Sequence, residues 1–239
     1  EHVAKEDYIN RLKTSAEEIK NFIIQNEVIE LPENNLDIVP MPLESQGITW
    51  TYLTYPGGYE SSNTFSLQIT PIPEDWEEDQ TKSFFEEYNN YLLYLWTVRK
   101  VYPGQFVPLF YTRKNPSLVR NLYPNMTLIK GWSVTLEEEL IVQGFGNYDL
   151  KLRLNQLKLL LKAVIDFKLE LNIHQGGMTK EMAIAYMTRG GFQTQAEAER
   201  KWNRIILKPV YSGYTYIGFQ EILDMEKEYK NLKGDSFSK

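Results

Sequence analysis

Apolar residues recur at intervals of three and four near the start of the chain, with charged residues between them: Tyr8, Leu12, Ala16, Ile19 and Ile23. In a helix this spacing gathers the apolar side chains on one face. We therefore predict an amphipathic helix over residues 5–25, followed by a proline-rich passage that reaches residue 42.

Two later segments favour strands. Residues 47–55 place large apolar residues among threonines, and residues 63–70 alternate through Phe65, Leu67 and Ile69. The turn sequence Pro56-Gly57-Gly58 lies between them, so we expect a hairpin or two neighbouring strands. No other sheet material is evident, and an edge strand here would suit an extended peptide.

From residue 76 onward the pattern is helical. One stripe runs until Pro103 and Gly104 interrupt it: Phe84, Tyr88, Leu92 and Leu95. Further helices are predicted over residues 126–143, 148–174, 179–188 and 194–207, with a last one around residues 219–223. Strands followed by helices favour an α+β, predominantly helical fold. We expect a single domain, 1–239, with a helix and strands in residues 1–75 and a helical bundle in residues 76–239.

The composition limits the chemistry. The absence of cysteine excludes disulfides and cysteine-based zinc sites, and the two histidines, His2 and His174, stand at opposite ends of the chain. A net charge of -6 argues against a nucleic-acid partner, which would need clustered basic residues. The most apolar long segment, residues 150–171, carries charges throughout, so no membrane-spanning segment is predicted.

Two short motifs suggest a family. The chain reads Arg99-Lys100-Val101-Tyr102-Pro103-Gly104-Gln105 around the predicted helix break, and Lys130-Gly131-Trp132-Ser133 further on. This order resembles domain of unknown function 885, a bacterial family similar to gluzincin-type zinc peptidases, with the motifs His-Glu-x-x-Pro-Gly-His and Glu-Gly-Trp-Ala. The resemblance covers nearly all of the chain and matches the C-terminal half of longer members. It implies a zincin-like fold with a site at Arg99, Lys100, Gln105 and Lys130.

These four positions hold residues unsuited to zinc hydrolysis. That chemistry needs imidazole and carboxylate ligands, and a carboxylate that takes a proton from the bound water. Arg99 and Lys100 replace the first His and the Glu, and Lys130 replaces the third ligand, so three cations stand where a dication would bind. Gln105, in place of the second His, is a poor zinc ligand. We therefore predict a degenerate site with no catalytic residue, metal or cofactor.

The closing part of the chain also follows the family pattern, which implies four cleft residues: His174, Arg204, Tyr214 and Tyr216. The family's tyrosine falls on Thr215, between the two tyrosines. A lone histidine at a helix end is also commonly a cap or a packing residue. The clustered cations could attract an anion, such as a peptide C-terminus, an acidic side chain or sulfate.

The leading hypothesis is a catalytically inactive zinc-peptidase-like domain that acts as a binding or structural module with a peptide or anion cleft. One rival is a hydrolase, either completed by sequence outside this chain or metal-independent and using Lys100, His174 and a tyrosine. Another is that the cations are ordinary surface charges. The acidic residues between 74 and 79 lack the spacing of a calcium loop and better suit a helix start. The oligomeric state stays open, as does an extracytoplasmic or cytoplasmic location.

Overall fold

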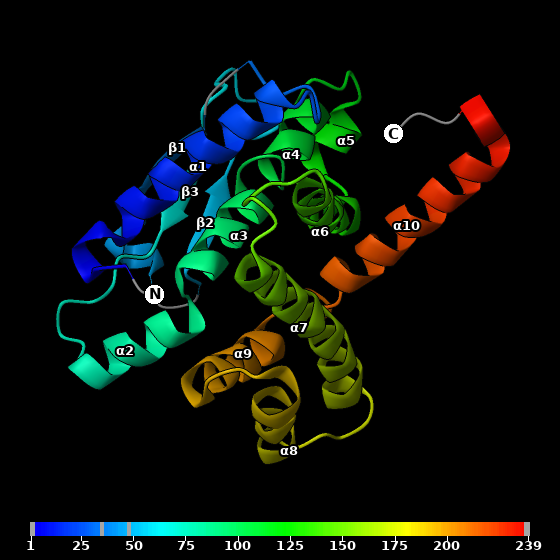
Figure 1. Ribbon diagram of the computed structural model, residues 1–239. Coiled ribbons are helices and arrows are strands. Elements are labelled where there is room, and N and C mark those ends of the chain that lie inside the picture. Colours follow the sequence, from blue (N-terminus) through cyan, green and yellow to red (C-terminus); the bar gives the residue numbers. More distant parts are fainter. Residues whose placement is uncertain (1–2, 34–35, 47–48, 237–239) are drawn as a thin grey trace.

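The computed structural model describes residues 3–33, 36–46 and 49–236. Within these ranges a three-stranded sheet lies near the N-terminus and helices make up most of the rest (Figure 1). The strands are β1 (Leu36–Pro40), β2 (Thr51–Thr54) and β3 (Phe65–Ile69). The predicted α+β, mostly helical fold class is thus confirmed.

One long helix, α1 (Tyr8–Gln25), precedes the sheet and contacts β1. The helices after the sheet are α2 (Glu78–Glu87), α3 (Asn90–Lys100), α4 (Phe106–Arg113), α5 (Leu118–Leu122), α6 (Met126–Val142), α7 (Leu150–His174), α8 (Lys180–Ala185), α9 (Gln195–Leu207) and α10 (Tyr214–Lys233). Short 3-10 turns lie at Lys5–Asp7, Leu43–Ser45 and Gly234–Ser236, and a π-helical turn at Tyr186–Gly190 follows α8. None of the described helices is both long and apolar enough to cross a bilayer.

The sheet has the order β1-β3-β2. β2 pairs with β3 in antiparallel register, with Leu53 opposite Leu67, as the hairpin prediction requires. Residues 47 and 48 of the predicted first strand lie outside the described residues. β1 was not predicted, because its segment ends in a proline; it pairs with β3 in parallel, with Ile38 opposite Leu67. Pro40, which has no N–H to donate, lies at the end of this edge strand.

The single helix predicted from residue 76 to the Pro103 break is in fact two helices. α2 ends at Glu87, and the side chain of Asn89 begins α3 by accepting hydrogen bonds from the N–H groups of Tyr91 and Leu92, each 3.1 Å long. The Asn89 amide also donates to the Asn155 side chain on α7, at 3.1 Å. The apolar stripe continues across the break because both helices contribute to the same core. Helices α4 and α5 were not predicted either.

The acidic residues between 74 and 79 form a helix start, as expected. Glu77 caps α2 in a reciprocal pair with Gln80, and Glu78 and Asp79 follow in the first turn. The predicted helix over 148–174 agrees closely with α7, and Thr194 caps α9 by accepting from the Glu197 N–H at 3.3 Å.

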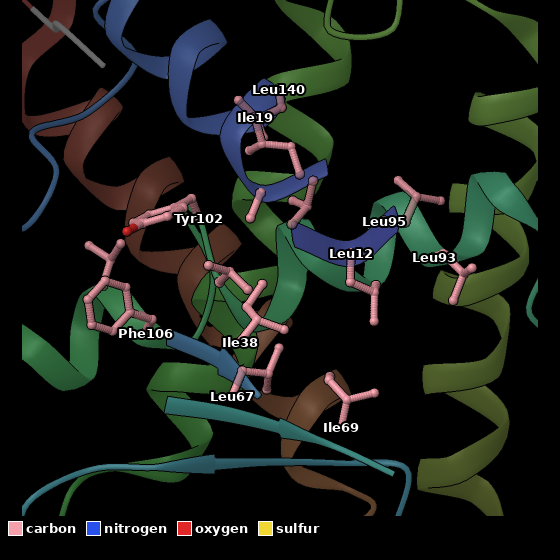
Figure 2. Packing of buried hydrophobic residues seen from close by; sticks show 14 of the residues in the cluster. Leu12, Ile19, Ile38, Leu67, Ile69, Leu93, Leu95, Tyr102, Phe106 and Leu140 are labelled. Atoms are coloured by element: carbon pink, nitrogen blue, oxygen red, sulfur yellow. The ribbon is translucent and has the colours of Figure 1, made fainter. Parts of the chain in front are cut away.

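Buried apolar side chains form two clusters. The larger one joins α1, the sheet, α3, α4 and α6, and includes Ile19, Leu67, Leu93, Phe106 and Leu140 (Figure 2). The smaller one joins the second half of α7 to α8 and α9, and consists of Ile165, Leu169, Ala183, Met187, Ala198 and Ile205. α3 and α6 pack in the larger cluster, and α9 packs in the smaller one. Charged side chains of these three helices line the space between the two clusters.

Candidate functional site: a cationic cavity

The turn after α3 folds the chain back on itself. The N–H of Gln105 donates to the carbonyl oxygen of Arg99 at 2.8 Å. A side chain on Gly104 could not fit, because its Cβ would lie 2.1 Å from the same carbonyl oxygen. The Lys100 ammonium donates to the Gln105 side-chain oxygen at 3.3 Å. The turn therefore brings three of the four predicted site positions together.

Helix α6 supplies the fourth position. The Trp132 indole N–H donates to the carbonyl oxygen of Pro103 at 2.9 Å, which fastens α6 to the turn. Gly131 lies directly against α10, since a Cβ there would come within 2.1 Å of the Gly218 backbone. Lys130 is consequently held 5 % exposed beside the turn.

These side chains line one cavity of about 220 Å³. Its wall includes seven cationic and two acidic side chains: Arg99, Lys100, Lys130, Lys162, Arg200, Lys201 and Arg204, with Asp166 and Glu197. The remainder is mostly aromatic, hydroxyl or small apolar, and it includes Thr49, Trp50 and Thr51 at the start of β2. The four predicted site positions and Arg204 thus meet on one surface, far apart as they are in the sequence.

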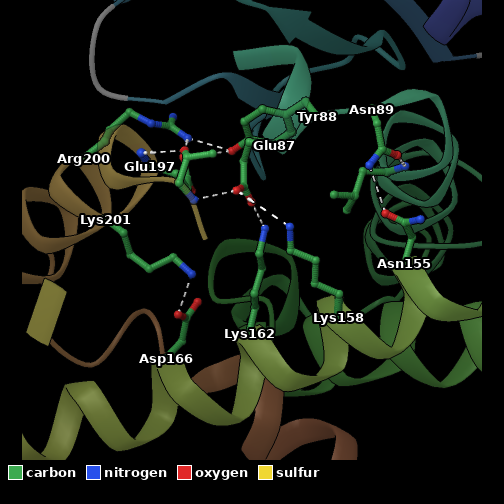
Figure 3. Close-up of polar contacts among 12 residues, drawn as sticks. Glu87, Tyr88, Asn89, Asn155, Lys158, Lys162, Asp166, Glu197, Arg200 and Lys201 are labelled. Carbon is green, nitrogen blue, oxygen red and sulfur yellow. Dashed lines mark hydrogen bonds and ion pairs between the residues drawn. The ribbon is translucent and has the colours of Figure 1, made fainter. Parts of the chain in front are cut away.

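Four of the cations have carboxylate partners. Arg99 forms a two-pronged pair with Glu137, which is fully buried on α6. Lys162 pairs with Glu87, and Arg200 pairs with Glu197 (Figure 3). The fourth pair joins the Lys201 ammonium to Asp166, at 2.7 Å. Burial raises the pKa of Glu137, while Arg99 opposes that shift.

Lys100, Lys130 and Arg204 form no salt bridge with a carboxylate among the residues that the structure describes, although Arg204 helps to lower the pKa of Glu197 and Asp166 acts to raise that of Lys130. The Lys130 ammonium donates to the Tyr211 carbonyl oxygen at 3.1 Å and lies 3.1 Å from the centre of that tyrosine's ring. Burial lowers the pKa of Lys130 to about 6, helped by the positive charges of Lys100 and Arg204. Burial also lowers the pKa of Lys100 to about 8, with Arg204 and Arg99 acting in the same direction. The cavity therefore has an unbalanced positive charge.

The other predicted cleft residues are placed differently. His174 lies at the end of α7, where its Nε2 is 3.2 Å from Glu170, and it does not line the cavity. The Tyr216 ring packs on Phe167 with ring centres 5.4 Å apart. Tyr214 approaches Lys130, with the ammonium 5.5 Å from its ring centre, while Thr215 lines the cavity itself. Lys100 lines the cavity together with Tyr88 and Tyr211, whereas His174 does not, and His2 lies outside the described residues.

On the α9 side of the cavity, sequence reasoning found Arg204 and missed Glu197, Arg200 and Lys201. Glu197, Arg200, Lys201 and Arg204 recur at intervals of three, one and three, which puts them on neighbouring faces of one helix. That spacing was a usable signal, but only the fold shows that this side of α9 lines the same cavity as α3 and α6. Tyr211 had no sequence signal, because its main contact to Lys130 uses a backbone carbonyl.

The donor set does not fit zinc. Arg99 and Lys100 offer no lone pair while charged, and Lys130 offers one only after losing its proton. Gln105 leaves a single amide oxygen, and it already accepts from Lys100. Across the described residues, His, Asp and Glu side chains form no group of three that could hold a metal ion.

Comparison with known proteins places the chain among bacterial proteins. The model of the family described as bacterial protein of unknown function (DUF885) matches residues 1–239. A solved structure of a candidate lipoprotein of unknown function from Shewanella oneidensis is 31% identical, with a TM-score of 0.86, over 100% of this chain and 42% of that one. Another, from Colwellia psychrerythraea, is 18% identical with a TM-score of 0.81, over 98% of this chain and 38% of that one, and it supports the fold alone. No curated protein matches. The chain thus spans about two fifths of the solved structures that it matches.

Proposed function

We propose, for a chain that belongs to the bacterial family DUF885, a binding module without zinc-peptidase activity whose cationic cavity holds the carboxylate of a peptide-like ligand. One observation carries the proposal: Lys100, Lys130 and Arg204 line one cavity and form no salt bridge in the described part of the chain. An incoming carboxylate would complete the pairing that the protein leaves unmade.

A peptide is the favoured ligand because of the neighbouring strand. Thr49, Trp50 and Thr51 line the cavity, and among the described residues β2 pairs with β3 alone. An extended chain could add to the other edge of β2 and direct its terminal carboxylate toward Lys100 and Arg204. The pairing of Arg99 with Glu137 keeps that arginine out of the binding role.

The direct test is calorimetry with N-acetyl-L-alanine, a small model of a peptide C-terminus, and with its uncharged amide. We expect the acid to bind and the amide to bind at least about tenfold more weakly. Lys100→Gln and Arg204→Gln should each weaken the acid, whereas Lys151→Gln, an exposed site on α7, should not. Equal binding of acid and amide, or no binding of either, would overturn the proposal.

The affinity should depend on pH. The model carboxylate stays ionised at every pH above about 5. Lys100, whose pKa is about 8, must be protonated to attract it. Affinity should therefore fall as pH rises from 7 to 9, by up to about tenfold per unit above pH 8. In Lys100→Gln this part of the dependence should vanish, and a wild-type affinity that does not change over that range would exclude a role for Lys100.

A separate experiment tests the expectation that this site does not bind zinc. We expect purified protein to contain no stoichiometric zinc, because cations occupy the positions of the ligands and the base. Replacing Arg99→His, Lys100→Glu, Gln105→His and Lys130→Glu together should create an affinity for one zinc ion per chain. Glu137, now paired with Arg99, could then accept a hydrogen bond from the new histidine.

Elemental analysis after dialysis against zinc measures the result. The matched control carries the first three substitutions but keeps Lys130, so it lacks the third ligand and should bind zinc much more weakly. If the four-fold variant folds and binds no zinc, the alignment with the zinc-peptidase motif is wrong. Tight zinc binding by the unaltered protein would contradict the proposed loss of the site.

A further inference from the structure

A second cavity, of about 390 Å³, adjoins the cationic one. The two share four lining residues: Trp50, Tyr88, Glu197 and Arg200. Beyond that shared wall the lining changes in character, because Trp76 and Phe84 replace the lysines. One side of the wall is therefore mostly cationic, whereas the other side carries aromatic rings together with polar and acidic side chains such as Asp79 and Glu87.

The aromatic rings that line the second cavity pack against one another. The Trp50 ring centre lies 4.8 Å from that of Phe84 and 5.5 Å from that of Trp76. Phe84 continues to Tyr88, with ring centres 4.8 Å apart. Apolar cavities of about 150 Å³ already accept a benzene ring. An aromatic or large aliphatic group would fit here and contact ring faces and edges.

The shared wall is thin and made of planar groups. The Arg200 guanidinium lies 5.0 Å from the Trp50 ring centre and donates to the Tyr88 hydroxyl at 2.7 Å. That hydroxyl donates to Glu197 at 3.1 Å, which closes the network seen in Figure 3. The indole N–H of Trp50 is buried and has no acceptor in the described part of the chain.

We propose that the two cavities form one site for an amphipathic carboxylate: the carboxylate binds at Lys100 and Arg204, and an aromatic or large aliphatic side group binds in the second cavity, against Trp50, Trp76 and Phe84. This inference rests on the proposed function and gives it a ligand class. The four shared residues place the cavities side by side, and the change in lining matches the change in polarity along such a ligand. In a peptide, the bulky group would be the side chain of the terminal residue or its neighbour.

The test compares N-acetyl-L-phenylalanine with N-acetyl-L-alanine by calorimetry. The two acids share their charge and their amide and differ in the ring. We expect the phenylalanine compound to bind about tenfold more tightly, or better. Ser83→Trp would fill the second cavity from α2, since Ser83 lines it but not the first one. That variant should lose the preference while its affinity for N-acetyl-L-alanine stays within about twofold.

A matched control separates filling the cavity from altering α2. Lys82→Trp adds the same bulk one residue away, at an exposed position that lines neither cavity, and it should keep the preference. Equal affinity of the wild-type protein for both acids would overturn the inference and leave the proposed function standing. A preference that survives Ser83→Trp would also overturn it, because the ring would then bind elsewhere. Failure of both acids to bind would remove the proposed function itself.

Discussion

Lys130 is the most unfavourably placed charge in the described part of the chain. It is buried, it lacks a carboxylate partner, and its pKa is lowered to about 6 from an ordinary value of 10.5. Between these two pH values the unfolded chain binds a proton that the folded protein does not bind. The free energy of unfolding therefore rises with pH across this range, as far as Lys130 determines it.

Lys130→Met should remove that cost. We expect the variant to be more stable at pH 7 by about 1–3 kcal/mol, since an apolar side chain of similar length needs no water. The gain should be largest near pH 6 and shrink toward pH 10, where the unfolded lysine also loses its proton. Urea denaturation at several pH values measures this, with the exposed Lys151→Met as control. A variant less stable at pH 7 would show that the Tyr211 contacts outweigh the burial cost.

For single residues, the sequence predicted which positions form the site better than it predicted the residues that these positions contact. Motif spacing selected Arg99, Lys100, Gln105 and Lys130, and the fold places all four on one cavity. The sequence could not show that Glu137 neutralises Arg99, since a pairing between helices depends on how they pack. It also grouped His174 with the cleft, whereas that side chain lies beside Glu170, one turn earlier on its own helix.

At the scale of elements, prediction succeeded where one apolar period ran without interruption. α1 and α7 have long amphipathic stretches, and their bounds agree with the expected ones to within a few residues. The break between α2 and α3 was hidden because apolar residues continue through it, and only the Asn89 side chain marks the new start. The sequence did not predict β1, because this strand forms only by pairing in parallel with β3, which lies further along the chain.

The crossing of α6 and α10 depends on two glycines. A Cβ on Gly218 would lie 1.9 Å from the carbonyl oxygen of Thr127, and one on Gly131 would lie 2.1 Å from the Gly218 backbone. Backbone atoms cannot move aside as side chains do, so the helices would have to separate. Gly218 is also the one buried residue of α10 within the described chain, and it lies where α10 packs on α6.

Gly218→Ala should therefore destabilise the protein by about 1–3 kcal/mol, despite the higher helix propensity of alanine. The control is Gly190→Ala, where a Cβ would meet only the Tyr186 ring at 3.9 Å. Thermal denaturation of both variants gives the comparison. If Gly218→Ala is as stable as Gly190→Ala, the close approach of the two helices is not needed for folding.

At the scale of the whole molecule, the cationic cavity lies between the two buried clusters. α3 and α6 belong to the larger cluster and α9 to the smaller one, and side chains of all three line the cavity. The ion pair between Lys162 on α7 and Glu87 on α2 crosses this junction (Figure 3). A ligand bound here would contact both clusters, so it should stabilise their association by mass action.

Glu87 is the main link across this junction. It is 1 % exposed at the end of α2, pairs with Lys162 on α7, and accepts from the Thr194 N–H at the start of α9, at 3.0 Å. Glu87→Gln would leave the buried Lys162 without its counter-charge. We expect a loss of about 3 kcal/mol in the free energy of unfolding, as is usual when one partner of a buried pair is removed.

The loss should not be spread evenly over the molecule. Glu87 contacts α7 and the start of α9, the helices that carry the smaller cluster, so amide hydrogen exchange should accelerate in α8 and α9 well before it does in α1 and β3. Glu86→Gln, an exposed neighbour on the same helix, should change neither measurement. Equal acceleration in all four elements would mean that the two clusters open as one cooperative unit. In that case the charged junction would be no weaker than the apolar packing on either side of it.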